Sequence, residues 1–290
     1  MKKSVKKTLK VLIYRILNII KLINSSQVSQ IVLMNQYRQM ASGKQQPNFQ
    51  DTGLHIYSQT DEDGFLLYIF SLIGTTNKKV IEIGSGDGIE CNSANLIINH
   101  GWNGLLLDGD STNINVGTKI YGFLKTTRVN PPKLVNAWIT SDNINQLIKD
   151  NGFESEIDLL SIDIDGNDYW IWKAIECVNP RVVIAEYNTY WMEEESVTVP
   201  YDPEFQAKII NGAYYCGASL AAFVSLGKKL GYRLVGSNTR QYNAFFVRND
   251  LGVDILPEVT VESCLSSYKN SQSLNQYNFP AIKELPWEKV

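Results

Sequence analysis

Short apolar runs alternate with amphipathic stretches through most of the chain. Five runs rich in Val, Ile and Leu predict buried strands, at residues 79–83, 105–108, 133–139, 157–163 and 181–186. Apolar residues at helical spacing predict helices at 65–73, 91–100, 143–149, 169–175 and 218–230. Two further strands, 232–236 and 244–248, are joined by a polar turn. We therefore expect an α/β fold with a parallel sheet and right-handed crossovers, closed by a hairpin that makes the last strand antiparallel.

The first 24 residues carry a different pattern. Apolar residues from Val5 to Ile23 fall on one face of a helix, and basic residues lie mainly on the other. Lys10, Arg15 and Lys21 interrupt the apolar run, so it lacks the roughly 20 apolar residues that a bilayer span needs. The pattern predicts a basic amphipathic helix that lies on an anionic membrane surface, or docks on its own domain or on a second subunit. Residues 25–50 are expected to form a linker with a helical piece at 31–40.

The charge of the chain is divided unevenly. Residues 1–50 hold nine Lys and Arg and no acid, so the net charge of −3 for the whole chain leaves −12 for residues 51–290. An acidic main domain argues against general nucleic-acid binding. The four cysteines are isolated and show no metal spacing, which is typical of reduced thiols in a cytoplasmic protein. We expect a cytoplasmic protein, either free or peripheral at the membrane surface.

A glycine-rich turn follows the first predicted strand. Residues 79–90 read KVIEIGSGDGIE, with glycines at Gly84, Gly86 and Gly88, and the next predicted strand ends in Asp108. This is the opening half of a nucleotide-binding domain, in which Asp108 would accept hydrogen bonds from ribose hydroxyls. Dinucleotide binding needs its third glycine one position later, where Ile89 stands. An NAD or nucleotide-sugar oxidoreductase is therefore the weaker alternative.

Polar residues follow all five strand ends. Since the carboxyl ends of parallel strands meet at one rim, where ligands bind, we expect these residues to surround a common cleft. They are the glycine turn, Asp108 and Asp110, Asn136 with Ala137 and Trp138, Asp163 and Asp165, and Glu186 with Tyr187 and Asn188. His55 lies upstream of the sheet and is a candidate general base, whereas His100 is expected at the opposite rim.

Two resemblances extend this interpretation. The glycine turn resembles the acid-x-Gly-x-Gly-x-Gly turn of S-adenosylmethionine-dependent methyltransferases, with Glu82 as the acid. From about Ser58 to Leu251 the chain resembles the FkbM-type methyltransferases, in residues 58–59, 61–64, 80–88, 158–166, 186–188 and 243–248. The resemblance implies a Rossmann-like, seven-stranded class I methyltransferase sheet in the order 3-2-1-4-5-7-6, flanked by helices. It also implies methyl transfer to an oxygen, often a sugar or natural-product hydroxyl.

The resemblance assigns roles to the rim. S-adenosylmethionine would contact Glu82, Gly84, Ser85, Gly86, Gly88, Asp108, Asn136, Ala137 and Asp163, with Trp138 either bordering the adenine or packing. A sugar hydroxyl is a weak nucleophile, so its proton must be removed or polarised. In one hypothesis Asp163 or Asp165 is a general base, with His55 as a further candidate. In the other, Asp163, Glu186 and Asn188 hold a Mg²⁺, since these all-oxygen ligands suit that ion.

The segment between residues 188 and 217 is longer than a strand–helix connection requires. Its aromatic residues suggest a lid over the acceptor or an ordinary packed excursion. We divide the chain into a basic helix (1–24), a linker (25–50), a methyltransferase domain (51–251) and a C-terminal extension (252–290). The function expected is O-methylation of a small-molecule or glycan acceptor, in particular a sugar or a lipid-linked glycan. A non-catalytic scaffold on the same fold is the remaining alternative.

Overall fold

The computed structural model describes residues 26–191, 195–269 and 279–290 of the chain. The chain forms two compact units, residues 1–46 and 47–290. In the first unit, α2 (Ser26–Ser42) contains the helical piece predicted at 31–40. The predicted basic amphipathic helix lies outside the described residues. Within the described ranges, every helix is too short or too polar to cross a bilayer.

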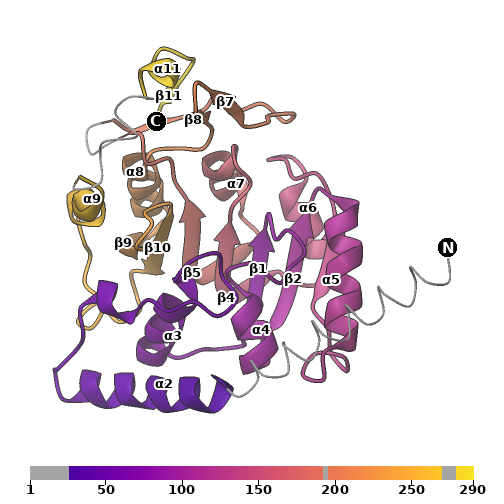
Figure 1. The fold of residues 1–290 in the computed structure, drawn as a ribbon, viewed down its shortest axis with the longest axis vertical. Helices are drawn as coiled ribbons and strands as arrows, with labels where there is room; N and C mark the ends of the chain where they lie inside the picture. The colour runs from indigo at the N-terminus through magenta and orange to yellow at the C-terminus, as the bar shows by residue number, and fades with distance from the viewer. Residues whose placement is uncertain (1–25, 192–194, 270–278) are drawn as a thin grey trace, which may run out of the picture. The chain divides into compact units, whose positions relative to one another are not determined.

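A seven-stranded sheet organises the second unit (Figure 1). The strand order is β3-β2-β1-β4-β5-β10-β9, and only β10 runs antiparallel to its neighbours. Since β9 and β10 are the sixth and seventh strands of the sheet in chain order, the predicted class I methyltransferase order 3-2-1-4-5-7-6 is confirmed. The strands are β1 (Lys79–Ile83), β2 (Asn103–Asp108), β3 (Lys133–Asn136), β4 (Ser155–Ile162), β5 (Val178–Glu186), β9 (Tyr232–Ser237) and β10 (Asn243–Arg248).

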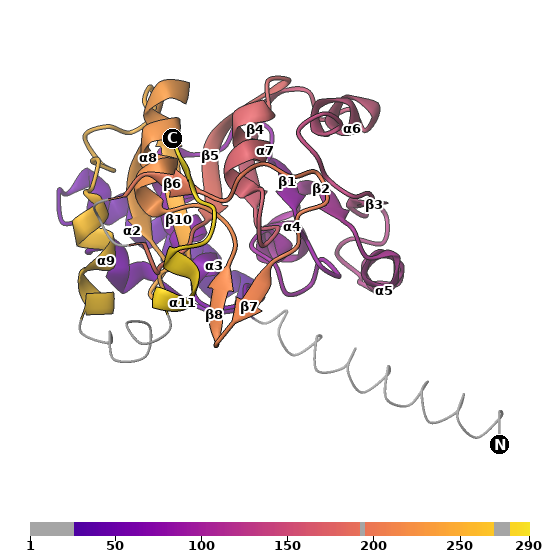
Figure 2. The same ribbon diagram turned by 90° about the horizontal axis from the view of Figure 1, so that it is seen from above.

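Helices cover both faces of the sheet. Figure 2 shows α3 (Glu62–Ile73) and α4 (Ala94–His100) on one face, and α7 (Asp168–Ala174) and α8 (Leu220–Leu230) on the other. The main apolar core fills the space between the sheet and the second group of helices, together with α6 (Ile144–Asp150). On the first face, Phe49 of the short helix η1 (Phe49–Thr52) stacks on Phe65 of α3, with ring centroids 4.7 Å apart. Burial of both faces explains why the central strands are almost continuously apolar.

One helix of the sheet domain carries too weak an apolar pattern to be predicted. This helix, α5 (Ser111–Phe123), connects β2 to β3, and only Ile114, Gly117 and Tyr121 are buried along it. Asp110 caps its first turn by accepting a hydrogen bond from the Thr112 amide at 2.6 Å. The position of α5 is therefore set by its N-terminal cap and by the connection from β2 to β3, and not by an amphipathic apolar stripe.

Two predicted strands end earlier than their apolar runs. β3 ends at Asn136 rather than 139, and Asn143 then bridges the turn by donating to the Trp138 carbonyl and accepting from the Thr140 amide. β4 ends at Ile162 rather than 163, because Asp168 accepts from the amides of Ile164 and Gly166. In both places a polar side chain that follows the strand satisfies backbone donors and turns the chain away from the ladder.

The end of the chain packs onto the rim of the sheet. The strand β11 (Glu288–Lys289) pairs with β6 (Val197–Thr198), beside the hairpin formed by β7 (Lys208–Ile210) and β8 (Ala213–Tyr215). A small core of its own joins this region to α11 (Pro280–Lys283), and α9 (Val261–Lys269) packs against α8. The described parts of the C-terminal extension thus belong to the same compact unit as the sheet.

Candidate active site

The carboxyl ends of β1, β2, β4, β5 and the start of β10 surround a cavity of about 820 Å³. Its wall is formed by residues from all the predicted strand ends and by residues from other segments of the second unit. The lining residues are Gln59, Glu82, Gly84, Gly86, Glu90, Cys91, Asn92, Asp108, Gly109, Asp110, Ser111, Ala137, Trp138, Ile139, Asp163, Ile164, Asp165, Asn167, Glu186, Phe205 and Asn243. The predicted common cleft therefore exists at this rim.

Gly84 is a glycine because β1 and β4 come unusually close where they end. A Cβ on Gly84 would lie 1.6 Å from the Asp163 carbonyl oxygen, and the residue has a φ of +83°. The Asp163 amide donates to the Ile83 carbonyl at 2.9 Å, which holds the two strand ends together. Gly84 thus allows the close approach that brings Asp163 into the cavity wall.

The Asp108 carboxylate links the glycine turn to the end of β2. One oxygen accepts the Gly86 amide at 2.8 Å, and the other accepts the Asp110 amide at 2.8 Å. Gly86 has a φ of +55° and open space at its Cβ position, so this part of the turn presents bare backbone. The geometry fixes a carboxylate and an open stretch of backbone on one wall, as expected of a ribose-binding turn.

Glu82 has a structural task as well as a place in the cavity wall. Its carboxylate accepts the amides of Asn92 and Ser93, each at 2.8 Å, and so holds the start of the segment that leads into α4. Burial raises the pKa of Glu82, against hydrogen bonds that lower it. With both oxygens engaged by backbone donors, Glu82 shapes the turn from beneath the cavity floor.

Gly88 and Ser85, predicted to touch the cofactor, do not line the cavity. A Cβ on Gly88 would meet Leu106 and Tyr121, so this glycine lets the turn pack against β2 and α5. Ser85 is buried, and its amide donates to the Leu107 carbonyl at 3.1 Å. The second glycine of the turn faces the cavity, while the third faces the protein.

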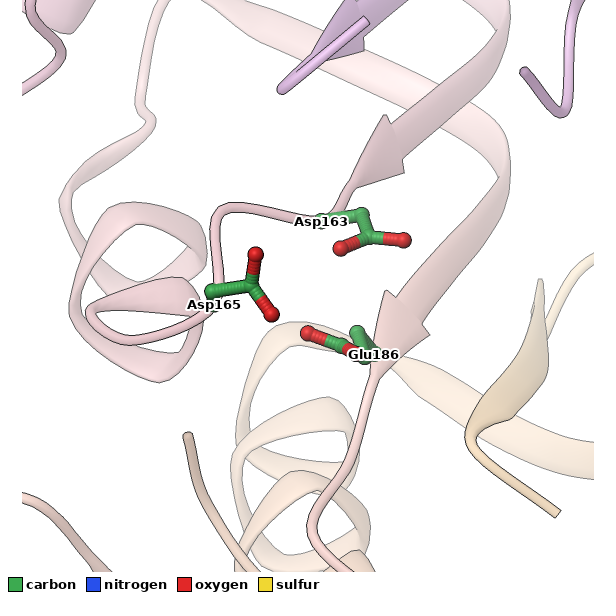
Figure 3. A group of neighbouring side chains, drawn as sticks. All are labelled: Asp163, Asp165 and Glu186. Carbon is green, nitrogen blue, oxygen red and sulfur yellow. The ribbon is translucent and has the colours of Figure 1, made fainter. Parts of the chain in front are cut away.

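Three carboxylates meet at the other wall. Asp163, Asp165 and Glu186 each offer an oxygen, and these atoms lie within 4.8 Å of one another (Figure 3). Asp163 follows β4 and Glu186 ends β5, whereas Asp165 stands in the loop between β4 and α7 with a φ of +52°. This left-handed conformation is uncommon for a residue other than glycine, and it turns Asp165 toward the other two acids.

Asp168 maintains that loop. Its two oxygens accept the amides of Ile164 and Gly166 at 2.8 and 2.9 Å. The positive φ lies at Asp165, and Gly166 is small because a Cβ there would lie 2.4 Å from Phe205. The turn is therefore made at Asp165 and not at Gly166, and this loop brings Asp163 and Asp165 together.

Crowding of acids controls their protonation. Burial, followed by the nearby charges of Asp168 and Asp165, raises the pKa of Asp163 to about 8. Burial and the charge of Asp163 raise the pKa of Glu186 well above its ordinary value. These carboxyls therefore retain protons near neutral pH unless a cation or a proton donor compensates their charge.

Several predicted site residues lie elsewhere. Asn188 points into its own loop, where its amide donates to the Cys216 carbonyl at 2.9 Å and its oxygen accepts the Tyr190 amide. Asn188 therefore does not join Asp163 and Glu186 as the predicted ligand set required, and Asp165 lies beside them instead. His55 is exposed and does not line the cavity, and Asn136 donates to the Asp108 carbonyl from an exposed position beside it.

Three lining residues outside the predicted strand ends and lid had no expected place in the cleft. Gln59 precedes α3, Asn167 precedes α7, and Asn243 begins β10. Residues 58–59 and 61–64 belong to the methyltransferase resemblance, but nothing in them indicated that their loop reaches the rim. Asn243 stands directly opposite Glu186 in the β5–β10 pairing, a register that only the sheet topology provides.

An aromatic strap closes one side of the cavity. Trp138, 54% exposed, donates from its indole nitrogen to the Pro203 carbonyl at 2.6 Å. Asn167 donates to the Asp202 carbonyl at 2.7 Å, and the Tyr201 hydroxyl accepts the Ser141 amide. Residues 199–205 are thereby tied to the ends of β3 and β4, and Phe205 reaches the cavity. Of the aromatic residues predicted to form a lid, Phe205 alone lines the cavity.

Comparison with known proteins finds similar solved structures. The N-terminal domain of EvdMO1 with SAH bound matches at a TM-score of 0.42 and 12% identity, over 66% of this chain and 80% of that chain. An S-adenosylmethionine-dependent methyltransferase from Clostridium acetobutylicum ATCC 824 matches at 0.37 and 10%, over 60% and 85%. Magnesium protoporphyrin IX methyltransferase (ChlM) from Synechocystis PCC 6803 with bound SAM matches at 0.36 and 12%, over 58% and 69%.

No protein-family model and no curated protein matches the sequence. The TM-scores of these three structures lie below 0.5. The fold assignment therefore rests on the observed strand order, and the FkbM-type subfamily stays a prediction.

Proposed function

We propose that this protein is an S-adenosylmethionine-dependent methyltransferase that methylates a hydroxyl group. Three features of the second unit support the proposal together. The sheet has the strand order of class I methyltransferases, a glycine turn and Asp108 face a cavity of about 820 Å³, and carboxylates stand across that cavity.

The charge of the cavity wall is the observation that favours S-adenosylmethionine over NAD or a nucleotide sugar. The lining includes seven acidic side chains, of which Asp163 and Glu186 have raised pKa values, and among the described lining residues there is no Lys, Arg or His. A dinucleotide would bring a pyrophosphate into this wall, and its negative charges would be repelled. A sulfonium cofactor brings positive charge to the same place. The acidic wall therefore favours S-adenosylmethionine over NAD or a nucleotide sugar, the alternatives left open by the glycine turn.

The chain's residues fit this cofactor without rearrangement. Asp108 is held by the amides of Gly86 and Asp110 and by the side-chain amide of Asn113, and its Oδ2 keeps a lone pair for a ribose hydroxyl. Gly86 exposes bare backbone toward the cavity, and Ala137 and Ile139 provide apolar surface for a base. When bound, S-adenosylmethionine supplies an electrophilic methyl group on a sulfonium centre.

The chain supplies the group that handles the acceptor proton. Asp163 and Glu186 have raised pKa values, so a deprotonated carboxylate of this pair is a stronger base than an ordinary one. In this route the Asp163 carboxylate takes the proton of the acceptor hydroxyl and shares it with Glu186. In the alternative route, Mg²⁺ at the same acids would supply a Lewis acid for the acceptor oxygen.

The acceptor proposed is a sugar or a lipid-linked glycan. Trp138 and Phe205 offer aromatic faces at the cavity wall, which suit the apolar face of a sugar ring, and the surrounding oxygens suit hydroxyl donors. Membrane contact through residues 1–23 and a cytoplasmic location remain predictions from the sequence.

Methyl transfer can be measured directly. The full chain is incubated with methyl-labelled cofactor and fractionated cell-envelope glycans, with and without EDTA. Label in a glycan fraction, absent with Asp163→Asn, supports the proposal. Loss of label with EDTA assigns the cation route, and label that persists assigns the base route. Label in protein or nucleic acid instead of glycan would refute the proposed acceptor.

A further inference from the structure

The acid cluster is bordered by a buried amide oxygen that has no partner. Asn243 is 2% exposed, lines the cavity, and its Oδ1 accepts no hydrogen bond. It stands opposite Glu186 in the antiparallel β5–β10 pair, so the two side chains project from the same face of the sheet. A buried acceptor left unpaired costs free energy, which indicates that a ligand supplies its partner.

The orientation of the Asn243 amide is fixed by Glu62. The Asn243 Nδ2 donates to Glu62 Oε1 at 3.0 Å, and this oxygen also accepts from Asn238 Nδ2 and from Thr60 Oγ1, each at 2.8 Å. Glu62 is fully buried, and a carboxylate surrounded by donors can only accept. The amide nitrogen must therefore face Glu62, and the amide oxygen must face away from it.

The cavity wall at this end presents oxygen acceptors. Asp163, Asp165 and Glu186 lie with one oxygen each within 4.8 Å of one another, and Asn243 adds a neutral oxygen. Asn167, 5% exposed, lines the same cavity and also has an unpartnered Oδ1. Among the described residues that line the cavity there is no basic side chain to compensate the acids. Carboxylate and amide oxygens without nitrogen or sulfur donors suit a hard divalent cation.

We propose that Asp163, Asp165, Glu186 and the Oδ1 of Asn243 bind a divalent cation, Mg²⁺ or Mn²⁺, and that Glu62 is the positioning residue for Asn243. This ligand set contains two residues that the sequence pattern did not assign to a metal, and it excludes Asn188. It deepens the proposed function by naming the ligands of the cation route, but the binding itself requires neither S-adenosylmethionine nor an acceptor.

Binding of Mn²⁺ to the full chain, without cofactor, tests the site. The chain is titrated with Mn²⁺, and the bound fraction is measured from the decrease of the free Mn²⁺ signal in electron paramagnetic resonance. Mg²⁺ is then added as a competitor. We expect one ion per chain with a dissociation constant in the micromolar to millimolar range. Asp165→Asn and Asn243→Ala should each weaken binding by about tenfold or more, because the first removes a negative charge from the cluster and the second removes a ligand oxygen.

Glu90→Gln is the matched control, since Glu90 is an exposed acid of the same cavity wall outside the cluster. It should change Mn²⁺ affinity by less than about twofold. Thermal melts followed by circular dichroism show whether each variant is folded. If Asn243→Ala fails to fold, Asp165→Asn still tests the site, because Asp165 is an exposed side chain.

The outcomes separate this inference from the proposed function. Absence of Mn²⁺ binding at millimolar concentration, or binding that Asp165→Asn leaves unchanged, overturns the cation site. S-adenosylhomocysteine binding is measured on the same sample. If S-adenosylhomocysteine binds and Mn²⁺ does not, the methyltransferase proposal stands without the cation. If Mn²⁺ binds at the cluster and S-adenosylhomocysteine does not, the cation site stands and the methyltransferase proposal fails.

Discussion

At the scale of single residues, Gly84 and Gly86 can be compared directly, because an added Cβ would meet different surroundings at the two positions. Gly84→Ala places a Cβ 1.6 Å from backbone of Asp163, whereas Gly86→Ala meets no atom within 4 Å. Both have positive φ, which costs roughly 1 kcal/mol for alanine. We expect Gly84→Ala to lower the free energy of unfolding by more than about 3 kcal/mol and Gly86→Ala by about 1 kcal/mol, measured by urea denaturation. Equal losses would contradict the close approach of β1 and β4.

Asp108 is the residue whose change should affect the cofactor most specifically. Its carboxylate ties Gly86 to the end of β2 and faces the cavity. Asp108→Asn replaces one acceptor oxygen by a donor, so S-adenosylhomocysteine affinity in calorimetry should fall by about tenfold or more. Asp110→Asn is the control, because asparagine also caps helices well and Asp110 lines the same wall. A larger loss with Asp110→Asn would refute the role of Asp108.

Asp63 gives a pH dependence of stability. Burial raises its pKa to about 6, although amides of Tyr57, Ser58 and Ile56 and the Ser58 hydroxyl lower it. The folded state therefore prefers the protonated carboxyl. That stabilisation is complete below about pH 4, falls as the pH rises to about 6, and is absent above it.

Asp63→Asn removes this titration and keeps an acceptor oxygen for the three amides that bond to Asp63. Between about pH 4 and pH 7 the wild type should therefore lose about 3 kcal/mol of stability relative to the variant. Urea unfolding curves at several pH values measure this difference. A gap between the two proteins that does not change with pH would contradict the raised pKa.

At the scale of elements, the apolar pattern predicted all seven strands of the main sheet, because each strand is a short, nearly continuous apolar run between turn residues, and the methyltransferase resemblance implied their order. It did not predict α5, because only Ile114, Gly117 and Tyr121 are buried along it and Gly117 contributes no apolar side chain. It also did not predict the pairing of β6 with β11, because each spans two residues. Contacts between distant short segments leave no local periodicity.

The residues of the candidate site also fall into those that the sequence predicted and those that it did not. Gly84, Asp108, Asp163 and Glu186 were found in advance because they stand at strand ends, where topology places ligands. Asn243 was missed because it enters the site through the antiparallel register with β5, and the left-handed conformation that turns Asp165 toward the other acids could not be predicted from the sequence. Positions that depend on sheet register or on a left-handed residue require the folded structure.

The C-terminal segment should stabilise the aromatic strap. Trp287 packs against Trp191 and Tyr215, with ring centroids 5.2 and 5.0 Å away, and its indole donates to the Ile282 carbonyl. Trp287→Ala should reduce unfolding free energy by about 2–4 kcal/mol, and Trp287→Phe by less, as measured by urea denaturation. Because Tyr215 also contacts Phe205, acceptor methylation should fall more than S-adenosylhomocysteine affinity. An equal loss of acceptor methylation and of S-adenosylhomocysteine affinity would indicate that the segment stabilises the whole fold and not the strap in particular.

At the scale of the whole molecule, the distribution of charge distinguishes two forms of the cofactor. The cavity wall carries seven acids, and S-adenosylmethionine has one positive charge more than S-adenosylhomocysteine. The charged form should bind more tightly by about tenfold at low salt, since roughly 1 to 2 kcal/mol is the scale of such an interaction at a partly solvated site. The difference should shrink as salt is added. Calorimetry at two ionic strengths measures it, and tighter binding of the uncharged form would contradict a cationic ligand at this wall.

The central claim is that the cavity beside Gly84, Gly86 and Asp108 binds the adenosyl cofactor rather than a dinucleotide. Isothermal titration of the full chain with S-adenosylhomocysteine and, separately, with NAD tests this directly. We expect one molecule of S-adenosylhomocysteine to bind per chain and NAD to give no binding heat, because the acidic wall repels its pyrophosphate. Saturable binding of NAD with no binding of S-adenosylhomocysteine would contradict the account.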